Sequence, residues 1–162
     1  MISRDLAQAL RDAGLRWRPA AGDRFVIPQP GLDEELFTLS EMTIEAREYR
    51  TGTILGFNGT TEWALDSVAQ EDALWMPRED QLRDRLGRAF VSLTRQAVDA
   101  PDGTAGPTSE AAPQDLEEGG VLYRVTTRGP GGERTYDAGT PADAYGLALL
   151  ALVQHALADA TG

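Results

Sequence analysis

Short turns between neighbouring apolar runs constrain the fold of this 162-residue chain more than any other feature of its sequence. One such turn is Thr51-Gly52, and Asn58-Gly59, a dipeptide typical of tight hairpins, follows it closely. A third turn, with the sequence GPGG, occupies residues 129–132. Strands joined by so few residues pair antiparallel, because a parallel connection needs about a dozen residues or more. The turns therefore predict hairpins and argue against a doubly wound parallel sheet.

Alternation of apolar and polar residues predicts the strands that these turns connect. It is clearest over residues 42–47 and again over residues 121–126. Residues 60–68 fit either a strand or a helix, and we favour a strand because Trp63 and Leu65 have the spacing of one. Shorter apolar runs predict further strands at 25–27, 36–39, 53–57 and 135–138.

Apolar residues at helical spacing predict three helices. The first covers residues 3–13 and ends at Gly14, which suits a left-handed cap. The third covers residues 140–158 and begins with a capping hydroxyl, a proline and an acid. The second covers residues 77–95, where an apolar stripe is formed by Leu82, Leu86, Phe90 and Leu93.

Together these elements predict a single α+β domain over residues 1–162. We expect a mainly antiparallel sheet of about five to six strands packed with about three helices. A segment at about residues 99–120 differs from the rest, because it is rich in Pro, Gly and acidic residues and has no apolar period. Such a segment buries too little apolar surface to offset the entropy of ordering, so we expect a flexible loop there.

Two residue types are missing from the chain, and their absence excludes several chemistries. There is no Cys, and all 15 basic residues are Arg. Without Cys there is no disulfide, thiolate nucleophile or zinc knuckle. Without Lys there is no Schiff-base amine and no phosphate loop of the GxxxxGK type. The only histidine, His155, is interpreted as a partly exposed residue of the third predicted helix.

The charge balance is strongly acidic, with 26 Asp and Glu against 15 Arg and a formal net charge of −11. This charge repels nucleic acids and anionic membranes, so we expect neither as a partner. The longest apolar stretch, residues 142–158, is interrupted by polar residues and falls short of the roughly 20 apolar residues that a membrane span requires. Because the first residues lack the apolar core of a signal peptide, we expect a cytoplasmic protein.

Residues 52–87 combine several features of a binding surface. They hold two of the three tryptophans next to a predicted turn and several acids, and Trp is enriched in interface hot spots. The alternative is that both indoles fill the core between sheet and helix. We predict a candidate interaction surface formed by Glu62, Trp63, Asp66, Trp75 and Arg78.

Three functions compete for this surface. The first is a non-enzymatic interaction or adaptor protein, whose protein partner presents a basic patch. The alternative is a carboxylate-based divalent-metal-binding protein or metal-dependent hydrolase that uses the same acidic region. No acidic run matches an EF-hand, and we predict no catalytic residue, metal or cofactor. A nucleic-acid mimic ranks last, because the acids lack phosphate-like regularity.

Five stretches of the chain are distinctive: FVIP (25–28), MTIEA (42–46), GTILGFNGTTEWALDSV (52–68), ALWMPREDQL (73–82) and AYGLALLAL (144–152). They resemble a family of small proteins from GC-rich, mainly actinobacterial genomes that often carry the label "pilus assembly protein CpaE". The resemblance spans most of the chain except residues 99–120, and it implies a domain of undefined role with a loose pilus association. It carries over no catalytic residue, because the ATPase domain of CpaE proper needs a phosphate-loop lysine that this chain lacks.

Overall fold

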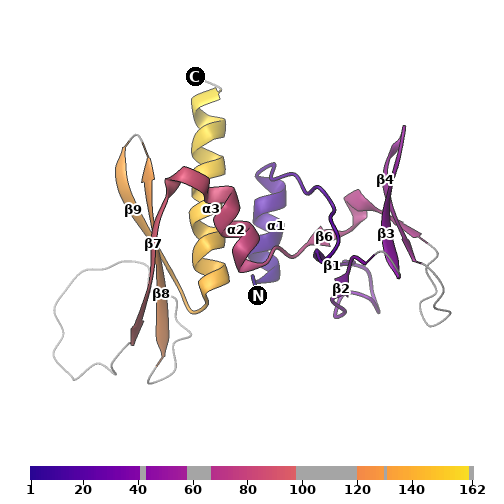
Figure 1. Cartoon of the computed structure of the whole chain (residues 1–162), viewed down its shortest axis with the longest axis horizontal. Helices are drawn as coiled ribbons and strands as arrows, with labels where there is room; N and C mark the ends of the chain where they lie inside the picture. Colours follow the sequence, from indigo (N-terminus) through magenta and orange to yellow (C-terminus); the bar gives the residue numbers. More distant parts are fainter. Residues whose placement is uncertain (41–42, 58–66, 98–119, 130, 161–162) are drawn as a thin grey trace.

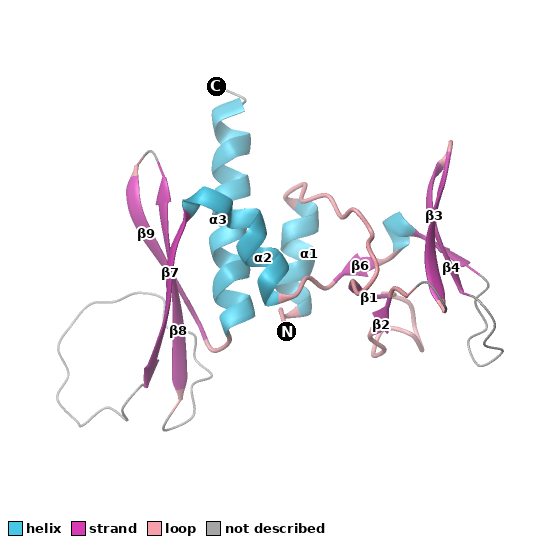
Figure 2. Cartoon of the chain, in the orientation of Figure 1, coloured by secondary structure: helices cyan, strands magenta, loops and turns pink. Residues whose placement is uncertain are grey.

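The computed structural model of the chain describes residues 1–40, 43–57, 67–97, 120–129 and 131–160. Within these ranges the chain forms three α-helices and nine strands, and every strand pairing is antiparallel. The predicted α+β class is therefore confirmed. The described strands divide among three sheets of three strands each, where the sequence analysis expected one sheet of five to six. Figures 1 and 2 show one sheet at one end of the molecule, the helices beside it, and the other two sheets beyond them.

The central sheet has the order β2-β1-β6 and is the smallest of the three. Its strands are β1 (Arg24–Val26), β2 (Phe37–Thr38) and β6 (Leu74–Trp75). Phe25 is opposite Phe37 on one side and opposite Trp75 on the other. Strands of two or three residues offer too few ladder hydrogen bonds to connect the neighbouring hairpins into one sheet, so the strands separate into three groups.

The second sheet has the order β3-β4-β5. Its strands are β3 (Ile44–Tyr49), β4 (Gly52–Phe57) and β5 (Ser67–Ala69). Tyr49 pairs with Gly52, whose φ of 139° is in the region that favours glycine. The turn predicted at Thr51-Gly52 is therefore found one residue earlier, at Arg50 and Thr51. The predicted Asn58-Gly59 turn and residues 60–66 of the next predicted strand lie outside the described residues.

The third sheet has the order β7-β8-β9, and one face of it packs against the last helix. Its strands are β7 (Phe90–Ala97), β8 (Val121–Gly129) and β9 (Gly132–Ala138), and α3 (Pro141–Ala160) follows. The pairing of Gly129 with Gly132 confirms the predicted second hairpin. The segment expected to be a flexible loop lies outside the described residues, apart from Gly120.

The prediction of a continuous helix over residues 77–95 is wrong in its second half. The helix α2 (Glu79–Leu86) ends at Gly87, which has a φ of 51°, and a 3₁₀ turn (Gly87–Ala89) leads into β7. Phe90 and Leu93 are three residues apart and would point to opposite faces of a regular strand. A bulge between Phe90 and Ser92 shifts the register of β7. As a result, Phe90 and Leu93 pack against the same core. The bulge therefore lets two apolar residues at helical spacing lie on the same face of a strand.

Two caps fix the ends of helices as the sequence predicts. The helix α1 (Arg4–Asp12) ends in a Schellman motif, in which Leu15 N–H donates to Leu10 O and Gly14 N–H donates to Arg11 O, both at 2.9 Å. At the start of α3 the Thr140 hydroxyl accepts a hydrogen bond from the Asp143 N–H at 3.1 Å. The Asp143 carboxylate also accepts the Ser3 N–H at 2.7 Å, which joins the amino ends of α1 and α3.

Two hydrophobic clusters stabilise the described part of the chain. The larger cluster lies where the three helices meet the β7-β8-β9 sheet, and its members include Leu6, Leu10, Leu82, Val125 and Tyr145. The smaller cluster lies between the central and second sheets, and its members include Phe25, Ile27, Phe37, Ile44 and Leu55. Val26 and Leu74 belong to the first cluster while Phe25 belongs to the second, so the central sheet has one face in each core.

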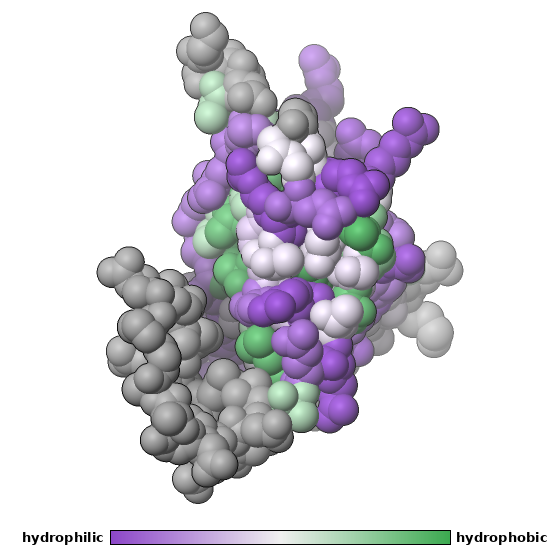
Figure 3. Space-filling model, turned by 90° about the vertical axis from the view of Figure 1, so that its left-hand side faces the viewer, coloured by the Kyte–Doolittle hydropathy of each residue, from purple (hydrophilic) through white to green (hydrophobic). Residues whose placement is uncertain are grey.

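The outer face of the β7-β8-β9 sheet carries cross-strand ion pairs. Arg124 on β8 donates to Asp137 on β9 at 2.7 and 2.6 Å, and Arg128 pairs with Glu133 further along the same two strands. Hydrogen bonds from Arg124 hold the pKa of Asp137 below its usual value. Figure 3, which views this side of the molecule, shows hydrophilic and hydrophobic residues mixed over it.

None of the described helices is both long and apolar enough to span a membrane.

Gly146 allows α1 and α3 to approach closely, and its substitution tests the helix contact. A Cβ atom at this position would lie 2.6 Å from Leu6 Cδ2 and 3.0 Å from Ile2 Cδ1. We expect Gly146→Ala to lower the free energy of unfolding by about 1 kcal/mol, because overpacking outweighs the gain in helix propensity. Urea unfolding measures the change. In the Leu6→Ala background the same substitution should be neutral or stabilising, and equal losses in both backgrounds would contradict the close contact.

Candidate functional site

The structure describes two of the five residues predicted to form the interaction surface. Glu62, Trp63 and Asp66 lie outside the described residues. Trp75 lies on β6 and is only 8% exposed, so its indole fills the core instead of standing out as an anchor. Arg78 lies directly before α2 and is half-buried. Trp75 is therefore a core residue, which the sequence analysis gave as the alternative to an exposed anchor.

Trp75 lines a cleft of about 770 Å³, which we name the Trp17–Trp75 cleft after the two indoles in its wall. Three parts of the chain enclose it: the end of α1 with the loop that follows, the start of β4, and the segment from Ala69 to Pro77. The cleft lies where the larger and the smaller core adjoin, because Leu10 and Leu74 of the larger core line it together with Ala73 of the smaller one. Trp17 was not predicted as a site residue.

Trp17 is held in this wall from three directions. Its ring stacks on Trp75 with an interplanar angle of 4° and centroids 6.4 Å apart, and it also contacts Phe25. Its Nε1–H donates to Asp23 Oδ2 at 2.8 Å. Its carbonyl oxygen accepts a hydrogen bond from Gln70 Nε2 at 2.7 Å. A residue of an irregular loop is thereby held by ring contacts and by hydrogen bonds of both its side chain and its backbone.

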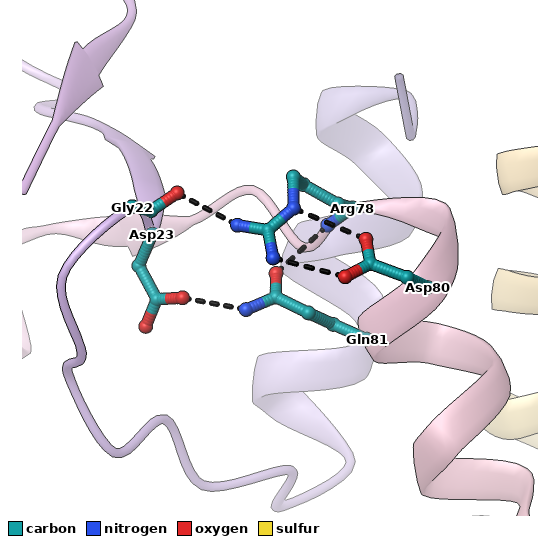
Figure 4. A network of polar contacts seen from close by, with 5 residues as sticks. All are labelled: Gly22, Asp23, Arg78, Asp80 and Gln81. Carbon is teal, nitrogen blue, oxygen red and sulfur yellow. Dashed lines mark hydrogen bonds and ion pairs between the residues drawn. The ribbon is translucent and has the colours of Figure 1, made fainter.

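Asp23 is the buried polar centre behind this wall, with an exposed fraction of 2%. Besides the Trp17 indole, its carboxylate accepts the Ala20 N–H at 2.9 Å and the Gln81 side-chain amide at 2.5 Å. Each of these donors is neutral, and together they satisfy a carboxylate that would be costly to bury alone. Figure 4 shows how Asp23 and Gln81 connect the loop before β1 to the first turn of α2.

Arg78 strengthens the same connection next to Asp23. Its guanidinium donates to Gly22 O at 2.7 Å and, through two nitrogens, to Asp80 at 3.1 and 2.9 Å (Figure 4). Its backbone N–H donates to Gln81 Oε1, which caps α2. The hydrogen bonds between Arg78 and Asp80 raise the pKa of the arginine and lower the pKa of the aspartate. Arg78 thus closes the network, and each of its three guanidinium nitrogens donates one hydrogen bond within it.

Trp75 retains one unsatisfied polar group. Its Nε1–H is buried and has no hydrogen-bond acceptor among the described residues. The Arg85 guanidinium carbon lies 5.5 Å from the centroid of its ring, within the range of a cation–π contact. A buried donor without an acceptor costs about 1–3 kcal/mol, so this nitrogen is a local weakness in an otherwise satisfied wall.

Charged residues at the cleft are exposed and of both signs. Arg11 and Arg16 contribute two guanidinium groups, and Glu71 contributes a carboxylate. Neither arginine forms an ion pair with another described residue. The local balance is therefore positive, although the whole chain carries a net charge of −11.

The described acidic residues do not assemble a metal site. No group of three or more Asp, Glu or His side chains in the described ranges is placed to hold a metal ion. Glu71 and Asp72 lie on a 3₁₀ turn (Gln70–Asp72) and both are exposed. His155, interpreted from the sequence as a partly exposed helix residue, is exposed on α3.

Comparisons of this chain with models of protein families, with curated proteins and with solved structures found no match. The resemblance to the family labelled CpaE stays a prediction. What the site does must therefore be argued from its own geometry.

Asp23→Asn tests whether the buried carboxylate holds the cleft wall together. The substitution keeps the shape of the side chain but replaces one acceptor oxygen by a donor, so at least one of its three partners loses its acceptor. We expect the free energy of unfolding to fall by about 2 kcal/mol. Urea unfolding followed by circular dichroism measures this loss. The exposed Asp33→Asn is the matched control, expected to change stability by less than about 0.5 kcal/mol. Equal losses in the two variants would show that Asp23 has no special role.

Proposed function

We propose that this chain is a non-enzymatic interaction or adaptor protein that binds a protein partner through a basic patch on that partner. The observation that carries the proposal is the uncompensated negative charge of residues 70–80. Glu71, Asp72 and Glu79 are exposed, and none of them forms an ion pair with a described residue. Of the acids in this segment, only Asp80 has an arginine partner. We name these three carboxylates the acidic rim.

The acidic rim closely follows, in sequence, three residues of the predicted interaction surface. Glu62, Trp63 and Asp66 precede it by a few residues, and their two carboxylates would add to its charge. Exposed carboxylates raise the rate of encounter with a partner of opposite charge, and the net charge of −11 acts in the same direction. A basic patch on the partner is the surface that this charge selects. The cytoplasmic location expected from the sequence is part of the same proposal.

The pKa shifts of five described residues reflect ion pairs and burial within the fold. A general acid or base works best with a pKa near the operating pH. Hydrogen bonds in the ion pairs lower the pKa of Asp80 and Asp137, and they raise the pKa of Arg78 and Arg124. Burial raises the pKa of Tyr145. Each of these shifts moves a pKa away from neutral, as expected for groups that stabilise the fold.

Charge-neutral substitutions in the acidic rim test the proposal. We expect Glu71→Gln with Asp72→Asn to reduce capture of the native partner from cells that express the chain by about tenfold, because the substitutions remove two charges from the contact. Quantitative mass spectrometry of the captured proteins measures the change. Raising the salt concentration should reduce capture by the unsubstituted chain in the same way.

A second pair of acids supplies the control. Asp33→Asn with Glu34→Gln removes the same charge from an exposed turn elsewhere in the chain. This pair should retain capture within about twofold of the unsubstituted chain, because it lies outside the rim. Equal loss in both pairs would show that net charge alone attracts the captured proteins and would overturn the assignment of the rim. Conversion of any substrate over several turnovers by the purified chain would overturn the non-enzymatic part.

A further inference from the structure

The Trp17–Trp75 cleft has the size and wall chemistry of a small-molecule site, and the acidic rim does not account for it. Its volume of about 770 Å³ is within the range of roughly 300–1,000 Å³ that is usual for ligand pockets. Apolar side chains line much of it, among them Leu10, Leu15, Ile54 and Pro77. The two indoles are nearly parallel in the same wall. A flat apolar body is the shape that stacks on such a surface.

Arginine side chains outnumber acidic side chains in the described lining of the cleft. Arg11 and Arg16 present guanidinium groups that have no ion-pair partner among the described residues. Trp75 carries a buried N–H group that lacks a described acceptor. Among the described residues that line the cleft, Glu71 is the one acid. The described lining therefore holds two cations against one anion, and a ligand that carries an anionic oxygen group supplies a partner for the unpaired arginines.

The carbonyl groups at the carboxyl-terminal end of α1 oppose an anion less than those of an uncapped helix would. The carboxyl-terminal end of a helix is normally unfavourable for negative charge, because its last carbonyl groups lack hydrogen-bond partners. The Schellman motif satisfies two of them, those of Leu10 and Arg11, through the N–H groups of Leu15 and Gly14. Arg11 lies in the last turn of the helix, and Arg16 follows the motif. Two cations thus stand beside a helix end whose own negative charge is partly neutralised.

From these observations we propose that the Trp17–Trp75 cleft binds a small organic acid with a flat apolar body and one anionic oxygen group. The apolar body stacks in the cleft, and the anionic group faces Arg11 and Arg16. The same chemistry occurs in a free aromatic acid and in the carboxyl-terminal residue of a polypeptide. The cleft and the acidic rim differ in the sign of their charge, because two arginines line the cleft. Glu71 belongs to both.

Matched probes test the proposal. We expect 2-naphthoate to bind the full chain with one-to-one stoichiometry and to bind roughly tenfold more tightly than 2-naphthamide, which has the same shape without the charge. Isothermal titration calorimetry measures both affinities. Arg11→Gln with Arg16→Gln should abolish this preference while leaving naphthamide binding unchanged. Arg4→Gln with Arg95→Gln is the control, because both arginines are exposed and lie outside the cleft. This control should retain the preference.

Two further measurements separate the possible sources and the two proposals. A short peptide ending in Phe is compared as the free acid and as the amide; tighter binding of the peptide acid than of naphthoate identifies a polypeptide end as the source, and weaker binding identifies a free acid. Glu71→Gln should strengthen naphthoate binding several-fold, whereas the adaptor proposal expects rim substitutions to weaken partner capture. Equal affinities for naphthoate and naphthamide, absence of saturable binding of naphthoate, or equal effects of both arginine pairs would overturn the cleft proposal and leave the adaptor proposal unaffected.

Discussion

The buried carboxylate of Asp23 is the interaction on which the described architecture depends most. It connects an irregular loop, through the Trp17 indole, to the first turn of α2, through the Gln81 amide. Its three donors among the described residues are all neutral. The pKa of the neighbouring Arg78 is raised first by its hydrogen bonds to Asp80 and further by the charge of Asp23. Two segments that are 58 residues apart at Asp23 and Gln81 are thus fixed by directed hydrogen bonds, which specify position more narrowly than apolar contact does.

The cleft follows from the way in which the central sheet serves two cores. Successive residues of a strand point to opposite faces, so Phe25 and Val26 are buried in different clusters. With only two or three residues in each strand, the central sheet is too small to cover the whole boundary between the cores. Trp17 and Trp75 line the space that remains. A gap of this kind survives because its walls are anchored independently, through Asp23 on one side and the β3-β4-β5 sheet on the other.

Local signals in the sequence predicted most of the elements but not their grouping. Gly14, Thr140 and the GPGG turn each act within a few residues, and each has the predicted effect. The apolar stripe from Leu82 to Leu93 led to the wrong prediction of a continuous helix, because a strand bulge gives the apolar residues of β7 helical spacing. Division of the strands into three sheets depends on pairings between distant residues, such as Phe25 with Trp75, and no local pattern contains that information.

The site was less predictable than the fold for the same reason. Trp75 was singled out as an aromatic residue beside acids, but its burial depends on Trp17, which lies 58 positions earlier in the chain. Asp23 resembled one more acid in an acidic chain, and only the donors around it reveal its role. Arg11 and Arg16 are likewise unremarkable in sequence, since one ends a helix and the other lies in a loop. Net charge describes the field far from the surface, whereas a cleft responds to the few groups that line it, so an acidic protein can hold a positively charged site.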